Sequence, residues 1–376
     1  MDQANIVIVG GGVIGCSIAR ELSKSYPDVF VLEALPRVGM LTSTRNSGVI
    51  HSGIYYTQGS LKARLCVRGN ALMYEFCTAN NVPFHKTGKI VVSATEEGLR
   101  DLEALKRNGG ANGVEGLRII DRAAIRKREP HIEGHYALEV ASTGILSSED
   151  LVKAHARLAT DNGAHIVTNA KVEKLERTAG GIRVESSAGE IEARCLINSA
   201  GLYADEIAAM LGSKMASHRI YPVRGEYCEL VRSRNDWVRG LVYPLPHPKG
   251  LSLGLHLTKT LHGTVLLGPT AKYVNDKNDY EKNRDSVEMF VEGAKALLPE
   301  ITKEDLVLAY SGIRPKLTAP GTAVGGHGSK SAPDFVIERD PDFPQAIQLM
   351  GMESPGLTSA SAIAEYVAGI AAEILV

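Results

Sequence analysis

The sequence predicts an α/β fold (α+β overall), in which an antiparallel-sheet domain is inserted into a domain built around a parallel sheet. Three observations support this. Residues 5–33 read as strand, glycine turn, helix and strand, the order typical of a βαβ unit. From 221 to 267, strand-like segments alternate with Pro, Gly and His turns, which favours antiparallel pairing. The chain then closes with a strand at 346–350, a turn and a helix at 359–376.

Composition excludes several classes of protein. The 376 residues allow two or three domains, at roughly 100–200 residues each. A net charge of -1 offers no basic excess for nucleic acid, so none is expected as a partner. No run of 18 apolar residues is present, so we expect no integral membrane segment. The odd number of cysteines, without a C-x-x-C pair, indicates a reducing, cytoplasmic location and no metal site; they are Cys16, Cys66, Cys77, Cys195 and Cys228.

The opening βαβ unit contains the motif Gly10-x-Gly12-x-x-Gly15 between a strand at 5–9 and a helix at 13–24. The first glycine permits a tight turn, the second lets the backbone approach a pyrophosphate, and the third allows close helix packing. The pyrophosphate would lie at the helix N-terminus, beside Val13 and Ile14. Glu33 follows the next strand, 18 residues beyond Gly15, where its carboxylate can accept ribose hydroxyls. These features predict a Rossmann-like dinucleotide site; a glycine turn needed only for packing is the alternative.

Two later segments favour FAD over NAD. A buried strand at 195–198 ends in Ser199-Ala200-Gly201, as expected where a second loop touches a dinucleotide. The turn at 351–358 precedes a helix whose positive end can face a flavin carbonyl, although a simple helix cap would explain the same residues. We therefore expect an FAD-binding domain, whose further candidate contacts are Val172, Ala200, Gly201, Gly351, Ser354, Pro355, Gly356, Leu357 and Thr358.

The remaining elements divide the chain into two domains. Helices are predicted at 61–80, 96–107, 121–130, 150–162 and 285–298, with a glycine-rich loop at Gly109-Gly110. Separate strands are predicted at 190–194 and 195–198, others at 225–231, 241–244, 251–257 and 264–268, and a small-residue loop at 321–333. We assign residues 1–80, 145–215 and 330–376 to the FAD-binding domain, and residues 81–144 and 216–329 to the substrate-binding domain.

A polar, glycine-bearing stretch at 42–56 follows the first βαβ unit and supplies candidate cofactor contacts from Thr44, Arg45, Asn46 and Ser47. This stretch and Ser60-Leu61-Lys62-Ala63-Arg64-Leu65-Cys66 resemble the L-2-hydroxyglutarate dehydrogenase (oxidase) family, within the D-amino-acid-oxidase-like FAD oxidoreductases. The resemblance continues through 200–205, 224–227, 243–246, 253–258 and 312–314 to Ser354-Pro355-Gly356-Leu357-Thr358, and so covers nearly the whole chain.

The resemblance implies oxidation of a 2-hydroxy acid, most simply L-2-hydroxyglutarate to 2-oxoglutarate, by hydride transfer to FAD. The turn at 351–358 contains neither Cys nor His, so we expect noncovalent FAD, with His51 as the alternative attachment point. Oxygen, a quinone and a carrier protein all remain open as electron acceptor. A quinone would allow peripheral association with the inner membrane.

The chemistry needs a base for the hydroxyl proton and cations for the carboxylates. His51 and His256 are the candidate bases, although each could instead bind a neighbouring carbonyl. Arg314 could hold a carboxylate through two parallel N–H bonds, unless it forms a structural salt bridge, and Lys316 could share its face of a strand. Further candidate hydrogen-bond donors to the substrate are Tyr55, Tyr243 and Thr258. A glycine- or sarcosine-oxidase-like amine oxidase and a non-catalytic flavin sensor are the alternative functions.

Overall fold

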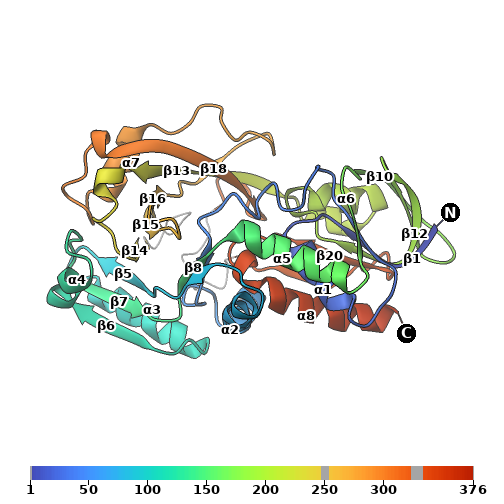
Figure 1. Ribbon diagram of the computed structural model, residues 1–376, viewed down its shortest axis with the longest axis horizontal. Coiled ribbons are helices and arrows are strands. Elements are labelled where there is room, and N and C mark those ends of the chain that lie inside the picture. The colour runs from blue at the N-terminus through green and yellow to red at the C-terminus, as the bar shows by residue number, and fades with distance from the viewer. Residues whose placement is uncertain (1, 247–253, 323–332, 376) are drawn as a thin grey trace.

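The computed structural model describes residues 2–246, 254–322 and 333–375, and places two lobes side by side (Figure 1). The first lobe is built on an eight-stranded sheet of order β10-β11-β12-β1-β2-β9, extended from β12 by β20 and then β19. Its strands are β1 (Asp2–Val9), β2 (Val29–Leu32), β9 (His165–Val167), β10 (Val172–Arg177), β11 (Ile182–Ser186), β12 (Gly189–Asn198), β19 (Val336–Arg339) and β20 (Ala346–Met350).

Side chains alternate along β1, so the two faces of the sheet pack into two different cores, and helices cover one of these faces. Ile6 and Ile8 point into a core shared with α1 (Val13–Leu22), α2 (Leu61–Ala79), α5 (Ser148–Asp161) and α8 (Gly356–Ile374). Val7 and Val9 face the opposite core, which the strands β10 and β11 close together with α6 (Ala204–Leu211). β1 is parallel to both β2 and β12, so the carboxyl ends of these strands lie at one edge, where dinucleotide sites form.

The second lobe is a nine-stranded sheet of order β17-β13-β16-β15-β14-β5-β7-β6, with β18 paired to the other edge of β13. Its strands are β5 (Lys89–Ser93), β6 (Leu117–Asp121), β7 (Tyr136–Val140), β13 (Tyr221–Leu230), β14 (Leu241–Pro244), β15 (His256–Lys259), β16 (Val265–Gly268), β17 (Lys272–Tyr273) and β18 (Leu306–Lys316). The helices α4 (Arg122–Arg128) and α7 (Val287–Ala294) pack on the face of Ile90, and α3 (Leu99–Ala111) packs on the face of Val91.

Short elements complete the fold. A three-stranded sheet of order β3-β8-β4 contains β3 (Val49–Ile50), β4 (Phe84–His85) and β8 (Gly144–Leu146). Single 3₁₀ turns are η1 (Gly201–Tyr203), η2 (Lys214–Ser217), η3 (Arg232–Arg234) and η4 (Lys303–Asp305). None of the described helices combines the length and apolar character that crossing a membrane requires.

The predicted fold class is confirmed: a mostly parallel sheet with helices and a largely antiparallel sheet share one chain. All strands of the eight-stranded sheet fall within 1–80, 145–215 and 330–376, and those of the nine-stranded sheet fall within the other two ranges. The division into domains itself stays a prediction. Most of the loop expected at 321–333, and the start of the strand expected at 251–257, lie outside the described residues.

Two predicted boundaries were wrong. β12 is a single strand over Gly189–Asn198 where two were expected, because its first half pairs with β11 and its second half with β20 while β1 runs alongside both. α3 continues through Gly109-Gly110 instead of ending before a loop. A Cβ on Gly109 would lie 2.9 Å from Ile54 Cγ2, so this glycine permits close packing of the helix on the 53–56 loop. Asn108 then donates to the carbonyls of Ile54 and Tyr56.

Candidate active site

A cavity of about 680 Å³ is lined by residues from both large sheets. One part is formed by segments that follow β1, β2 and β12, including Gly10, Glu33 and Ala200. The other part is formed by residues of β13, β14, β15 and β18. Predicted site residues that line it are Gly10, Gly12, Val13, Ile14, Glu33, Arg45, Asn46, Ser47, His51, Tyr55, Val172, Ala200, Gly201, Tyr243, His256, Arg314, Lys316, Ser354, Pro355, Gly356 and Leu357.

The glycine turn between β1 and α1 is shaped by close backbone contacts. Gly10 has φ +99, and a Cβ there would lie 2.8 Å from the carbonyl oxygen of Ser199. Gly15 does not line the cavity; a Cβ on it would lie 2.0 Å from the Gly10 carbonyl oxygen, so it serves helix packing. Gly12 precedes α1 without a side-chain cap of its own, and Ser43 Oγ accepts a hydrogen bond from Val13 N at 2.9 Å in the first turn, beside the cavity.

Glu33 is held at the end of β2 by backbone N–H groups. Its Oε2 accepts a hydrogen bond from Gly11 N at 2.8 Å, and its Oε1 accepts one from Leu35 N at 2.8 Å. Burial raises the pKa of Glu33, while the bonds from Leu35 and Gly11 oppose this. The carboxylate therefore fixes the glycine turn as well as facing the cavity.

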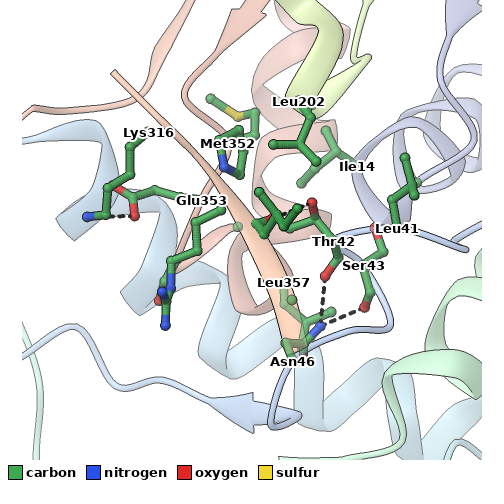
Figure 2. Close-up of a pocket in the computed structure, with 18 of the residues that line it drawn as sticks. Ile14, Leu41, Thr42, Ser43, Asn46, Leu202, Lys316, Met352, Glu353 and Leu357 are labelled. Carbon is green, nitrogen blue, oxygen red and sulfur yellow. Dashed lines mark hydrogen bonds and ion pairs between the residues drawn. The ribbon is translucent and has the colours of Figure 1, made fainter. Parts of the chain in front are cut away.

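The 42–47 segment borders the cavity, where Thr42, Ser43 and Asn46 lie close together (Figure 2). Asn46 Nδ2 donates to the carbonyls of Thr42 at 3.1 Å and Ser43 at 2.8 Å, so its amide organises the loop. Thr42 Oγ1 donates to Ile313 O on β18 at 2.9 Å. Thr44 does not line the cavity, because its hydroxyl donates to Gly39 O at 2.7 Å.

The 351–358 turn carries groups that hold His51. The backbone N–H of His51 donates to Thr358 Oγ1 at 2.9 Å, and its Nε2 lies 3.2 Å from Ser354 Oγ. Thr358 is buried and does not line the cavity. Gly351 has φ +72 and packs against Leu317, also away from the cavity.

Burial holds the His51 imidazole in its neutral form. Its Nδ1 is buried and has no hydrogen-bond partner among the described residues. Burial, and then the charge of Lys89, lower the pKa of His51 to about 3. The ring is therefore neutral near pH 7 and keeps a lone pair available.

Aromatic rings form the wall of the cavity contributed by β14 and β15. The rings of Tyr243 and His256 stack with centroids 3.6 Å apart and an interplanar angle of 13°. Tyr55 lines the same region and is buried. Thr258 lies outside the cavity lining, although His256 lies within it, because two residues along a strand span about 6.6 Å.

Arg314, on β18, lines the cavity. Its Nη1 donates to Thr270 O at 3.2 Å, and no carboxylate of the described residues lies within ion-pair distance. On the neighbouring strand β13, Val223 lies opposite Arg314, and the next residue is Arg224. Arg224, by contrast, forms an ion pair with Glu226, with 2.8 Å between Nη2 and Oε1. A Cβ on Gly225 would lie 2.8 Å from the Arg314 guanidinium, so this glycine makes room for the cation.

Lys316 lines the cavity but is paired, which the sequence did not indicate. Its Nζ lies 3.2 Å from Glu353 Oε2 (Figure 2). Lys62 Nζ lies 3.1 Å from Glu353 Oε1. Although burial opposes it, the two lysines lower the pKa of Glu353 to about 2. The single negative charge of Glu353 therefore neutralises half of the combined charge of Lys62 and Lys316.

No group of three His, Cys, Asp or Glu in the described ranges could hold a metal ion.

Comparison with known proteins decides the family. Residues 5–370 match the family described as FAD dependent oxidoreductase. The chain belongs to this family of FAD-dependent oxidoreductases. It is an enzyme with FAD as its cofactor, which confirms the expectation drawn from the glycine motif together with the 199–201 and 351–358 segments.

Relatives of this FAD-dependent oxidoreductase carry a more specific name. It is 33% identical to the mitochondrial L-2-hydroxyglutarate dehydrogenase of Arabidopsis thaliana, over 98% of this chain and 83% of that protein. It is 30% identical to the L-2-hydroxyglutarate dehydrogenase of Indibacter alkaliphilus, over 95% of this chain and 96% of that protein. Among solved structures, FAD-bound L-alpha-glycerophosphate oxidase from Mycoplasma pneumoniae superposes with TM-score 0.87 at 27% identity, over 100% of this chain and 95% of that one.

The glycine oxidase of Geobacillus kaustophilus superposes with TM-score 0.81 at 21% identity, covering 99% of this chain and 95% of that chain. At this identity the similarity shows the shared fold alone. The fold therefore accommodates donors of different kinds, and the donor of this enzyme must be argued from its own site.

Proposed function

We propose that this FAD-dependent oxidoreductase oxidises L-2-hydroxyglutarate to 2-oxoglutarate. Proteins named for this reaction are 30% and 33% identical to it over nearly the whole chain. The observation in the structure that carries the proposal is Arg314, whose guanidinium faces the cavity without a carboxylate partner among the described residues. A substrate carboxylate would complete that ion pair.

FAD would lie along the cavity, with its pyrophosphate against the Gly10–Gly12 turn and the N-terminus of α1. Side chains at Gly10 and Gly12 would narrow the cradle, since a Cβ on Gly12 would lie 3.0 Å from Ser43 Oγ. Glu33 would accept hydroxyls of the adenosine ribose while it continues to bind Gly11 N. The 351–358 turn and Ala200 would border the flavin end.

Bound FAD would supply the acceptor for the hydride leaving the carbinol carbon of the substrate. The chain's own task is to take the hydroxyl proton, and we assign this to the His51 imidazole, which is neutral near pH 7. Ser354 Oγ, 3.2 Å from His51 Nε2, orients the ring from the 351–358 turn. His256, stacked on Tyr243, would shape the pocket instead.

Arg314 would hold one carboxylate through two N–H groups, which fixes the substrate's orientation as well as its charge. The Lys62–Glu353–Lys316 cluster, defined by the two ion pairs of Glu353, carries a net positive charge and borders the same cavity. Tyr55 and Tyr243 add phenol groups to the pocket wall. This combination favours a dicarboxylate over a neutral amine.

The test is an anaerobic titration of the purified enzyme with L-2-hydroxyglutarate, D-2-hydroxyglutarate, sn-glycerol 3-phosphate and glycine, followed by flavin absorbance. We expect bleaching by L-2-hydroxyglutarate at micromolar to low-millimolar concentration, and none by its enantiomer. Bleaching by glycine alone would identify an amine oxidase and refute the proposal.

A further inference from the structure

A buried lysine lies behind the wall of the cavity that β14 contributes. Lys89 begins β5, and its side chain is fully buried, with relative exposure of 0%. Its Nζ has no hydrogen-bond acceptor among the described residues. An isolated buried ammonium is costly, so it is retained where something compensates it or uses it.

Two tyrosine rings provide that compensation. Lys89 Nζ lies 4.4 Å from the ring centroid of Tyr55 and 4.7 Å from that of Tyr243, both within cation–π range. Both tyrosines line the cavity, and the Tyr243 ring stacks on His256. Lys89 itself does not line the cavity. The rings therefore separate the charge from the ligand while transmitting its field.

The strand places Lys89 on this side by its register. Lys89 pairs with Leu241 of β14 and with Val140 of β7, and it shares its face of β5 with Val91. Val91 belongs to the core that contains both tyrosines, whereas Ile90 faces the other core of the lobe. The charge is thus directed toward the site by the alternation of the strand.

We propose that Lys89 is a positioning residue that makes this end of the cavity selective for anionic ligands, acting through the rings of Tyr55 and Tyr243. The inference rests on the proposed function, because it assumes that the substrate's acid groups enter between these residues. A cation behind a phenol ring draws electron density from it, which makes the hydroxyl a better donor to an anion. In the buried site this charge is poorly screened, so it acts over several ångströms.

The groups facing Lys89 come from several elements. His51 and Cys66 are close enough to interact electrostatically with it, from the 51–56 loop and from α2. The charged residues that line the cavity include Arg314 and the Lys62–Glu353–Lys316 cluster. No carboxylate of the described residues pairs with Lys89, so an anionic ligand would be its counter-charge.

The protonation state of Lys89 should make the binding of an anionic ligand depend on pH. Burial lowers the pKa of Lys89 to about 7, with Cys66 opposing the shift. Below that pKa the ammonium is charged and an anion binds tightly. Above it the amine is neutral and the anion loses this attraction. Binding of an anion near pH 7 should therefore take up a proton onto Lys89.

The experiment measures binding and not turnover. Glutarate, which lacks the hydroxyl to be oxidised, and the uncharged glutaramide are titrated into the holoenzyme from pH 6 to 8.5 by flavin absorbance. Calorimetry in two buffers of different ionisation enthalpy measures the proton uptake on the wild type itself. The variants are Lys89→Met and, as matched control, Lys272→Met, which removes an exposed charge from β17 of the same sheet.

We expect glutarate to bind about threefold more weakly at pH 8 than at pH 7, with proton uptake at pH 7, because only about half of the Lys89 side chains are charged at pH 7. Lys89→Met should bind it about tenfold more weakly at pH 6.5, without pH dependence, while Lys272→Met behaves as wild type and glutaramide binding is unchanged throughout. Binding that is independent of pH and buffer in the wild type overturns the proposal, whether or not Lys89→Met folds. If glutarate binds the wild type and Lys89→Met equally, the role of Lys89 is refuted and the proposed function still stands. If neither glutarate nor any 2-hydroxy acid binds the wild type, both the role of Lys89 and the proposed function are refuted.

Discussion

The Nε2 of His51 lies 3.2 Å from the Oγ of Ser354, although 303 positions of sequence separate the two residues. The same turn supplies Thr358, whose hydroxyl accepts the backbone N–H of His51 at 2.9 Å. The C-terminal turn therefore both borders the cavity and holds the candidate base. Orientation of the imidazole is built into the fold before a ligand arrives.

His51→Gln should slow anaerobic flavin reduction roughly 100- to 10,000-fold, the usual contribution of a general base. Glutarate affinity should change little, because a neutral ring adds little to holding a dianion. Since the pKa of His51 is lowered to about 3, the wild-type reduction rate should not fall as the pH is lowered from 8 to 5. Stopped-flow bleaching across this range checks both points. A wild-type rate that declines through pH 6.5, where an unperturbed histidine titrates, would contradict this assignment.

Arg314→Lys should keep the fold and the flavin but weaken substrate binding. A two-pronged contact becomes a single one, and a hydrogen bond to a charged group contributes roughly 1.5–3 kcal/mol, equivalent to about 10- to 150-fold in affinity. Gly225→Ala should produce a related defect, because its Cβ would lie 2.8 Å from the guanidinium. The concentration dependence of flavin reduction by L-2-hydroxyglutarate measures both. Unchanged values for Arg314→Lys would remove this residue from the site.

Glu33→Ala should weaken retention of FAD by removing the acceptor of the Gly11 and Leu35 N–H groups. One charge-assisted hydrogen bond is worth roughly 1.5–3 kcal/mol, so we expect at least about tenfold weaker binding. Flavin released on dilution and detected by fluorescence gives the dissociation constant. Glu21→Ala is the control, since Glu21 pairs with Arg20 and Lys24 and does not line the cavity. Equal FAD retention in the two variants would mean that Glu33 has no role in binding.

His155 should make the enzyme sensitive to acid. It is fully buried on α5, stacks on Phe76 at 4.1 Å, and has no hydrogen-bond partner among the described residues at either nitrogen. Burial, followed by the charge of Arg20, lowers its pKa well below the usual value. The unfolded state therefore binds more protons below pH 6.5, and stability falls as the pH falls.

Melting temperatures at pH 7.5 and pH 5 test this. His155→Leu should lose fewer degrees between the two pH values than the wild type, because the buried site no longer excludes a proton. His165→Leu, at the exposed β9 position, is the control and should retain the wild-type difference. A His155→Leu difference as large as that of the wild type would show that another group causes the acid loss.

Sequence reasoning found the parts of the site that follow local rules. Gly10, Gly12 and Glu33 are spaced by the geometry of one βαβ unit, and His51 and Arg314 stand out within family-like segments. The roles that it missed depend on segments distant in sequence. Glu353 is held by Lys62, 291 positions away, and this pairing neutralises part of the charge that Lys316 was expected to offer.

Lys89 left a signal that went unused: it is a single charge at the start of the otherwise uncharged strand Lys89–Ser93. Its meaning became clear only when the fold placed two tyrosines around it. Likewise, the Gly109-Gly110 pair reads as a loop until α3 is seen to pack on Ile54. Glycine serves both turns and close helix packing, so local pattern alone does not separate the two.

The most direct test of the central claim is a single-turnover experiment in the absence of oxygen. Excess L-2-hydroxyglutarate is mixed with holoenzyme, flavin bleaching is followed, and the quenched mixture is assayed for 2-oxoglutarate. We expect complete bleaching with one 2-oxoglutarate formed per flavin reduced, and no bleaching with D-2-hydroxyglutarate. A flavin that stays oxidised with the L-enantiomer, or one that bleaches without forming 2-oxoglutarate, would contradict it.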